Sequence, residues 1–586
     1  MTATPQSINL AGAGRSAGLS NNNGNGKDIP DRPLSAPPRT STPPPSRAIP
    51  KDFKSSLSAW WSTSSYKEAR LAEERLLRRM ANFEPAPPNE VQKGWFGFGS
   101  SSSSTSSSSE AAQKIEIDNT LPPEEIGQIK EPLTLPNSGL VATLRNVFIP
   151  TPDPALAPLH PADPRDPSQS QSQSAASSST DLSEQGNSHT RKKYHISHSH
   201  KCKKHDGKLV DYINTLEITK PQDKDSKEGV VVLHGYAAAL GFFFRNWESV
   251  SLSSSSTGRR TFFLDWLGMG LSSRPSPNLL NSPSTSTTPS RVARAEHFFV
   301  SSLEAWRESV GLEKMVLVGH SLGGYLASAY SVRYPERVSG LVLVSPAGIP
   351  HGPEYMKYPL TSELSSQEKL KANSASAKIT SNQRERETSQ ELEDATDAAE
   401  AEFSSSPNTP KGEAKEWAKR REESVLRRGM MKFFVWGWER GLSPFTFLRS
   451  AGPFGPMWVG KYSSRRFAAQ SEEDVRDLHS YIYGTSIMKG SGEYCISHIL
   501  APGAYARIPI VDRINRLKVP VTFMYGDNDW MDVDGGHASV KALKEAGNLN
   551  ARCHVVPKAG HHLYLDNPEY TNKLIEQAIK AIPQSA

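Results

Sequence analysis

Residues 315–330 read MVLVGHSLGGYLASAY. The first four residues form a short apolar run typical of a buried strand, and a helix-like segment begins at Leu322. Gly319, Ser321 and Gly323 therefore form the pattern G-x-S-x-G on a strand-to-helix turn, which is typical of a nucleophile elbow. Such a turn needs residues almost without side chains around the serine, and it holds the serine hydroxyl above the positive end of a helix. We therefore predict that Ser321 is a nucleophile.

The composition predicts one large folded domain with disordered additions, because only 36% of the 586 residues are hydrophobic and 44 are proline. The net charge of +6 is small for this length, and no basic stripe with interleaved aromatic residues suggests a nucleic-acid partner. Three scattered cysteines are too few for a disulfide framework, which favours a reducing compartment. The longest apolar stretch, 229–244, is shorter than the ~20 residues that cross a bilayer, so we expect any membrane contact to be peripheral.

The N-terminal region divides by composition. Residues 1–56 are rich in Ser, Pro, Asn and Gly and are predicted to be disordered. Residues 57–83 predict a basic amphipathic helix entered through Trp60 and Trp61, whose rings favour the headgroup region of a membrane. By composition, a membrane anchor and a helix docked on the domain with both tryptophans in its core fit this segment equally well.

Residues 84–207 are predicted to be a mostly disordered Ser/Pro-rich linker, with one strand at 140–148. The linker ends in a His-rich run, 195–205, that lies in a polar, lysine-rich segment without a second ligand cluster. We interpret this run as solvated linker and expect no metal site.

From residue 208 the pattern changes to apolar strands that alternate with helical or turn segments, which predicts a mostly parallel sheet covered by helices on both faces. The core is predicted in two parts, 208–350 and 510–586. The expected strands are 212–218, 230–233, 261–264, 315–318, 340–345, 519–525 and 553–556.

Residues 351–509 interrupt the predicted core and are interpreted as a cap or lid. Within them, 365–415 is charged and of low complexity, which predicts disorder, whereas 430–462 is dense in Phe, Trp and Met with scattered Lys and Arg. Such side chains suit the acyl chains and phosphate of a lipid. The alternative is that these aromatics form only the cap's own core.

A serine needs a base to become nucleophilic, and the base needs an orienting acid. In a sheet of this kind the acid follows a late strand and the histidine follows the last one. We predict Asp529 as the acid rather than Asp527, a choice that loop geometry decides, and His561 as the base rather than His562 because Gly560 lets the loop turn sharply.

The oxyanion produced by nucleophilic attack needs two backbone N–H donors. We predict Leu322, directly after the nucleophile, and Tyr236, in the small-residue loop after strand 230–233. His320 is expected to be structural, because its side chain points into the domain.

Four stretches carry a resemblance: LHGYAAALGFFFRNW, FLDWLGMGLSSRP, EAWRESVGLEKMVLVGHSLGGYLASAYSVRYPERVSGLVLVSPAGIP and GHHLYLDNPE. They resemble the abhydrolase-domain 4/5 subfamily of α/β hydrolases, over residues 212–350 and 430–583. Members of that subfamily include N-acyl phospholipid lipases, a lipid-droplet lipase co-activator, and fungal cardiolipin deacylases and lysophosphatidic acid acyltransferases. The resemblance implies an α/β-hydrolase fold with an inserted cap, and it favours the membrane-anchor interpretation of Trp60 and Trp61.

His561 and Asp566 match the H-x4-D motif that the family links to acyl transfer. Asp566 or Asn567 followed by Pro568 also makes a good helix start, and one histidine cannot serve two independent centres. The co-activator branch lacks the nucleophilic serine that this chain has at 321.

We expect from the resemblance a serine acyl hydrolase that deacylates a glycerophospholipid of the cardiolipin or N-acyl type, without a cofactor. The alternatives are a lysophosphatidic acid acyltransferase that uses acyl-CoA and a non-enzymatic lipase co-activator. The expected location is a mitochondrial or lipid-droplet surface, or the cytoplasm. Asp28 and Asp31 weaken a mitochondrial presequence.

Overall fold

The computed structural model describes residues 43–62, 65–81, 133–135, 137–161, 204–205, 208–280, 282, 286–352, 435–438 and 440–584. The chain divides into the unit Met1–Pro43 and the unit Pro44–Ala586, and all the elements below belong to the second. The disorder expected for 1–56 is wrong for residues 53–56, which begin a helix. The disorder expected for 1–42, for 365–415 and for most of 84–203 lies outside the described residues, as does the linker interpretation of the His-rich run over 195–203.

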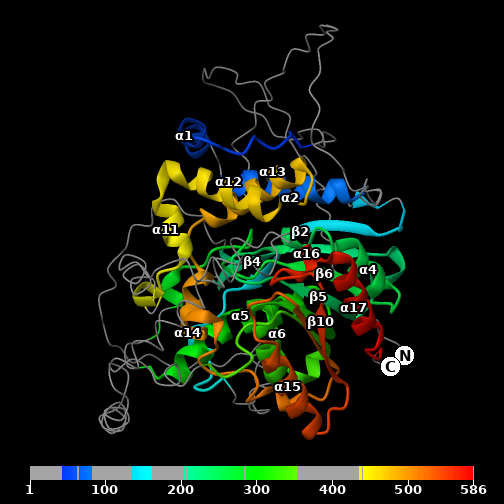
Figure 1. The fold of residues 1–586 in the computed structure, drawn as a ribbon. Coiled ribbons are helices and arrows are strands. Elements are labelled where there is room, and N and C mark those ends of the chain that lie inside the picture. Colours follow the sequence, from blue (N-terminus) through cyan, green and yellow to red (C-terminus); the bar gives the residue numbers. More distant parts are fainter. Residues whose placement is uncertain are drawn as a thin grey trace, which may run out of the picture. The chain divides into compact units, whose positions relative to one another are not determined.

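The centre of the structure is one sheet in the order β1-β2-β4-β6-β5-β7-β8-β9-β10, with β3 paired to β4 (Figure 1). Neighbouring strands from β6 to β10 run parallel, whereas β1, β2 and β4 add an antiparallel edge. The strands are β1 (Leu133–Thr134), β2 (Val141–Pro150), β3 (Lys204–His205), β4 (Lys208–Thr219), β5 (Glu228–Leu233), β6 (Arg260–Leu264), β7 (Lys314–His320), β8 (Val338–Val344), β9 (Val521–Gly526) and β10 (Ala551–Val556).

The mostly parallel α/β-hydrolase sheet is therefore confirmed. The core begins earlier than predicted, because β2 pairs with β4 along its whole length and so makes residues 141–150 part of the sheet.

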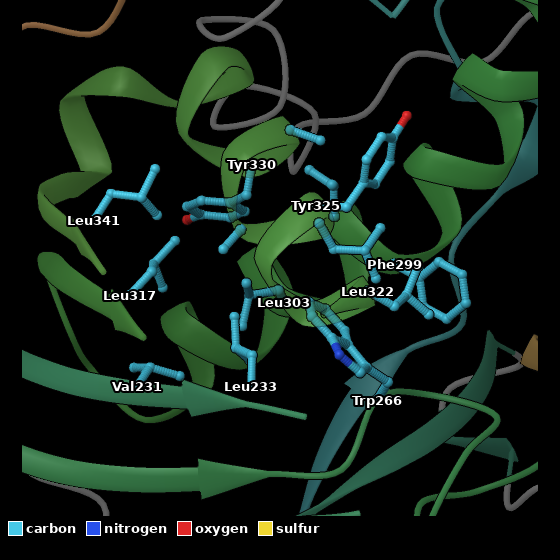
Figure 2. Packing of buried hydrophobic residues seen from close by; sticks show 14 of the residues in the cluster. Val231, Leu233, Trp266, Phe299, Leu303, Leu317, Leu322, Tyr325, Tyr330 and Leu341 are labelled. Atoms are coloured by element: carbon cyan, nitrogen blue, oxygen red, sulfur yellow. The ribbon is translucent and has the colours of Figure 1, made fainter. Parts of the chain in front are cut away.

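The central strands are apolar throughout because helices cover both of their faces. Val316 and Val318 of β7 belong to one hydrophobic cluster and Leu317 to the other. Figure 2 shows part of the second cluster, in which Leu317 and Leu341 pack with residues of the covering helices. Each such buried aliphatic side chain stabilises the fold by about 1.5–3 kcal/mol.

Helices α4 and α17 supply residues to the first cluster, and α5, α6 and α15 supply residues to the second. Asn567 caps α17 with its side chain and Pro568 follows at the first position, which confirms the predicted helix start. The core helices are α4 (Trp247–Ser255), α5 (Thr288–Ser309), α6 (Leu322–Arg333), α15 (Val533–Glu545), α16 (Leu563–Asp566) and α17 (Pro568–Lys580).

The segment predicted as one surface helix over 57–83 forms two helices with opposite environments. In α1 (Phe53–Ser62), Trp60 and Trp61 are 41% and 82% exposed, so neither lies in a core. In α2 (Ser65–Ala81), most of the described side chains are buried against the cap helix α13 (Figure 1). The prediction of a lipid-facing helix is therefore wrong for α2.

The described part of the 351–509 insertion is helical and lies between β8 and β9 in the chain, as a cap should. Its helices are α11 (Pro444–Ser450), α12 (Gly455–Arg466), α13 (Glu472–Ser486) and α14 (Ile496–Ile499). Within the described ranges no helix has both the length and the apolar character needed to cross a bilayer.

Candidate active site

Ser321 stands on a strained turn between β7 and α6. Its φ of 51° lies in the region that L-residues avoid, a conformation that costs on the order of 1–3 kcal/mol and is found mostly at functional sites. A Cβ at Gly319 would lie 2.5 Å from the Gly323 carbonyl oxygen, and one at Gly323 would overlap the Leu233 carbonyl. Both glycines are therefore required sterically, and the elbow geometry expected from the motif is present.

The structure brings together His561 and Asp529. Nδ1 of His561 lies 3.1 Å from Oδ1 of Asp529, and the two side chains are only 4% and 1% exposed. The second oxygen of Asp529 accepts the hydroxyl of Ser345, and Oδ1 also accepts the amide of Met531 at 3.0 Å. Asp527 instead accepts the amide of Ala559 at 3.0 Å and is exposed.

The environment of Asp529 favours its ionised form. Burial alone would raise the pKa of its carboxyl, but the imidazole of His561 and the hydrogen bonds from His561, Ser345 and Met531 outweigh burial and hold the pKa below its usual value. An ionised Asp529 favours the tautomer of His561 that carries its proton on Nδ1, in which Nε2 is the nitrogen that can act as a base.

His320 ties the elbow to the histidine loop. Its Nε2 donates to the carbonyl oxygen of His561 over 3.1 Å, and burial, reinforced by the nearby charge of His561, holds the pKa of His320 well below its usual value. His562 is buried next to Phe242, and its pKa is also held well below its usual value, mainly by burial. The hydrogen bond from His320 to the carbonyl of His561 therefore makes His320 a structural link between the elbow and the histidine loop.

The two predicted oxyanion donors lie on the two segments next to Ser321, the start of α6 and the loop that begins at Gly235. Leu322 is the first residue of α6, so its amide has no partner within the helix. A Cβ at Gly235 would come within 2.9 Å of the Cβ of Ser321, which places the loop carrying Tyr236 against the nucleophile. The ring of Tyr236 packs edge-on against the cap residues Phe445 and Trp438, with centroids 5.5 and 6.3 Å away.

His234 shapes this loop from within. Its Nδ1 donates to the Gly235 carbonyl at 2.7 Å, and its Nε2 accepts the Trp266 amide at 3.0 Å. Asp265, at the end of β6, accepts the amide of Leu240 at 2.7 Å and so holds the far end of the same loop.

A buried polar network extends from Asp265 to the N-terminal helix. Asn214 donates to Asp265 at 2.8 Å and also to Glu73 of α2. Glu73 accepts Arg70 at 2.8 Å and the hydroxyl of Tyr481 at 2.9 Å, and that hydroxyl accepts the amide of Gly241 at 3.2 Å. Burial raises the pKa of Glu73 to about 7, against the opposing charge of Arg70.

Sequence reasoning missed this network because its members come from α2, β4, the end of β6 and α13. The only signal in the sequence was Asp265 at the end of an apolar strand.

Asp566, of the H-x4-D motif, supports the histidine loop and the cap. Its Oδ2 accepts the amide of Gly560 at 3.0 Å, and its Oδ1 pairs with Nη2 of Arg466 on α12 at 2.9 Å. Within the described ranges, no group of three or more His, Cys, Asp or Glu side chains is arranged to hold a metal ion.

Comparison with known proteins fits this geometry. Residues 229–435 match the model of the alpha/beta hydrolase fold family. The chain is 31% identical to a 1-acylglycerol-3-phosphate O-acyltransferase of Arabidopsis thaliana over 61% of its own length and 67% of the relative's. It is also 30% identical to a (lyso)-N-acylphosphatidylethanolamine lipase of Mus musculus, over 62% of this chain and 82% of that protein.

The chain belongs to the α/β-hydrolase family. A further relative, 1-acylglycerol-3-phosphate O-acyltransferase ABHD5 of Rattus norvegicus, is 28% identical over 60% of this chain and 77% of that protein. These relatives confirm the abhydrolase-domain 4/5 resemblance, and the fold together with the lipase relatives supports hydrolase activity in this α/β hydrolase.

Proposed function

We propose that this α/β hydrolase is a serine acyl hydrolase that deacylates a glycerophospholipid. The observation that carries the proposal is the buried Asp529–His561 pair on the loops that meet the strained Ser321 elbow. A catalytic role for these residues explains both the positive φ of Ser321 and the burial of an ionised carboxylate.

In the proposed reaction His561 takes the proton of Ser321 as the serine oxygen attacks the ester carbonyl. The amides of Tyr236 and Leu322 hold the resulting oxyanion, and Asp529 stabilises the imidazolium. His561 then gives its proton to the departing lysolipid oxygen, which leaves an acyl group on Ser321. Water, deprotonated by His561, attacks this acyl group and releases a fatty acid and free Ser321.

The substrate class rests on the relatives and on the cap. Relatives in the family are named as lipases and acyltransferases of phosphate-bearing glycerolipids. Trp438 and Phe445 of the cap pack against Tyr236 in the oxyanion loop. These rings give the site an apolar wall suited to an acyl chain. We include cardiolipin and N-acyl phospholipids among the candidate substrates.

The test is product analysis with a panel of phospholipids, with wild type and Ser321→Ala assayed side by side. We expect wild type to release free fatty acid and lysolipid from at least one member, including cardiolipin and N-acylphosphatidylethanolamine, and Ser321→Ala to release neither. Equal release by the two proteins would contradict the proposal.

A second candidate is acyl transfer to lysophosphatidic acid, which the names of two relatives favour. The same acyl-Ser321 would then come from acyl-CoA, with coenzyme A as the leaving thiol, and the lysolipid hydroxyl would replace water. Radiolabelled phosphatidic acid formed from acyl-CoA by wild type and not by Ser321→Ala would establish transfer.

We further propose that the enzyme works at the surface of a membrane or lipid droplet, with the mitochondrion and the lipid droplet as candidate locations. The exposed Trp60 and Trp61 of α1 support this proposal, because tryptophan favours the membrane–water boundary. A fluorescently tagged chain and its Trp60→Ala/Trp61→Ala variant would test it by their distribution between membrane and soluble fractions.

A further inference from the structure

The chain leading into α1 is fastened to the cap helix α12. A Cβ at Gly460 would lie 2.8 Å from Cγ2 of Ile49 and 3.1 Å from the Pro50 carbonyl oxygen, so only glycine permits this approach. The buried Ser56 donates to the carbonyl of Pro453 and accepts the amide of Met457 at 3.0 Å. Helix α1 is therefore part of one surface with α12.

Where these segments meet, Lys51 from one side and Lys461 and Arg465 from the other line a cavity of about 400 Å³ that is open to the surface. Ser464 adds a hydroxyl, and among the described residues that line the cavity none is acidic. The nearby carboxylate of Asp52 is engaged by the amide of Ser55 at the start of α1. Three converging cations repel one another, and a bound phosphate would relieve that repulsion through charge-assisted hydrogen bonds.

Exposed aromatic rings continue this surface. Phe53 of α1 packs on Phe454 with ring centroids 5.1 Å apart, and Phe454 stacks on Trp458 at 6.1 Å. These three rings are 47%, 45% and 51% exposed. Trp458, Lys461 and Arg465 follow at helical spacings of three and four residues, so the aromatic and cationic side chains share one face of α12.

We propose that this cavity binds the phosphate group of an anionic phospholipid within a membrane surface, while the aromatic rings beside it enter the interface. The combination of apolar rings with cations on one face is what an interfacial site requires, and it favours a lipid over free phosphate. This inference rests on the proposed function at a lipid surface and names the lipid class that the surface recognises.

The surface also connects to the active site through the chain. Arg465 faces the cavity, and the next residue, Arg466, pairs with Asp566, which holds the loop of His561. Docking would therefore occur on the same helix that secures the catalytic histidine.

The test measures binding of the full chain to sedimented vesicles, with Ser321→Ala as the background so that no lipid is consumed. Vesicles of phosphatidylcholine alone are compared with vesicles that also contain phosphatidic acid. The test variant is Lys461→Glu/Arg465→Glu. The control, Lys541→Glu/Lys580→Glu, makes the same change in net charge at exposed positions on α15 and α17.

We expect phosphatidic acid to strengthen binding, Lys461→Glu/Arg465→Glu to weaken binding to the anionic vesicles on the order of tenfold, and the control to retain most of the preference. Trp458→Ala should weaken binding to both vesicles. An unchanged preference in the test variant, or an equal loss in the control, would overturn the proposal. The proposal would also be overturned if glycerol 3-phosphate in solution displaced the chain from the vesicles as effectively as competing phosphatidic acid vesicles do. That outcome would indicate a site for free phosphate.

Hydrolysis of a water-soluble short-chain ester, measured with Ser321 present, separates the two proposals. Lys461→Glu/Arg465→Glu should keep this activity, which also shows that the variant is folded. Absence of any ester hydrolysis by the wild type alongside normal vesicle binding would count against the proposed reaction and leave the lipid site standing.

Discussion

At the scale of single residues, the two neighbouring carboxylates after β9 have different tasks. Asp529 contacts the ring of His561, whereas Asp527 accepts a hydrogen bond from the amide of Ala559. We expect Asp529→Asn to lower kcat by about 10⁴ because the imidazole loses its orienting charge. Asp527→Asn should lower kcat no more than about tenfold, since a loop hydrogen bond is worth only about 1 kcal/mol. Steady-state kinetics on one ester substrate provide the measurement, and a larger effect at Asp527 would reverse the assignment.

The residues of the elbow and the histidine loop could be anticipated from the sequence, because each follows an apolar strand and their order along the chain is restricted. The choice between Asp529 and Asp527 could not, since both follow Gly526 within three residues and only the path of the loop separates them. Glu73 and Asn214 could not be found either, because their contact joins residues 141 positions apart.

At the scale of elements, Asp566 joins the histidine loop to α12. Because its carboxylate holds Gly560 and Arg466, we expect Asp566→Asn to lower hydrolysis and any acyl transfer by the same factor. Removing one partner from a buried ion pair costs about 3–5 kcal/mol, so the thermal stability of Asp566→Asn should also be lower than that of the wild type. Arg466→Met is the matched variant on the other side of the pair. Loss of transfer with hydrolysis intact would instead give Asp566 a separate role in transfer.

Glu73 makes the docking of α2 sensitive to pH. Its folded-state pKa of about 7 lies above the usual 4.5, so the folded chain binds more protons than the unfolded chain between these values. Its contribution to stability is therefore greatest below this window and declines as the pH rises through it. We expect the free energy of unfolding of the wild type, relative to that of Glu73→Gln, to fall by up to about 3 kcal/mol between about pH 5 and about pH 8. Urea unfolding of the two proteins provides the measurement. A pH-independent difference would contradict this account.

Composition indicated helix in 57–83, which is what α1 and α2 form over 57–62 and 65–81, but the side chains of α2 suit lipid and protein equally well. The outcome depends on Gly484 of α13, where a Cβ would lie 2.8 Å from that of Ala69, and on a buried partner for Arg70. Gly484 and Asn214, a buried hydrogen-bond partner of Arg70, lie far from α2 in the chain, so no local pattern reveals these contacts.

At the scale of the whole molecule, the N-terminal helices are part of the folded unit. Deletion of residues 1–81 would expose the face of α13 that α2 covers, and we expect an insoluble chain or a Tm lower by on the order of 10 °C. Deletion of residues 1–43, which form a separate unit, should leave Tm within about 2 °C of wild type. Scanning calorimetry of the two truncations is the measurement, and equal melting would show that α2 contributes little.

The parallel part of the sheet could be predicted because its strands are buried on both faces and read as continuous apolar runs. The antiparallel edge was harder to assign, since β2 is half exposed and lies between stretches of linker composition.

The central claim is that Ser321 is an activated nucleophile, and labelling with a fluorophosphonate followed by peptide mass spectrometry tests it most directly. We predict one modified peptide that contains Ser321 in wild type, no labelling of Ser321→Ala, and much slower labelling of Asp529→Asn than of Asp527→Asn. A wild-type chain that the probe leaves unmodified, or modifies at another residue, would contradict the claim and favour a non-catalytic role for the elbow.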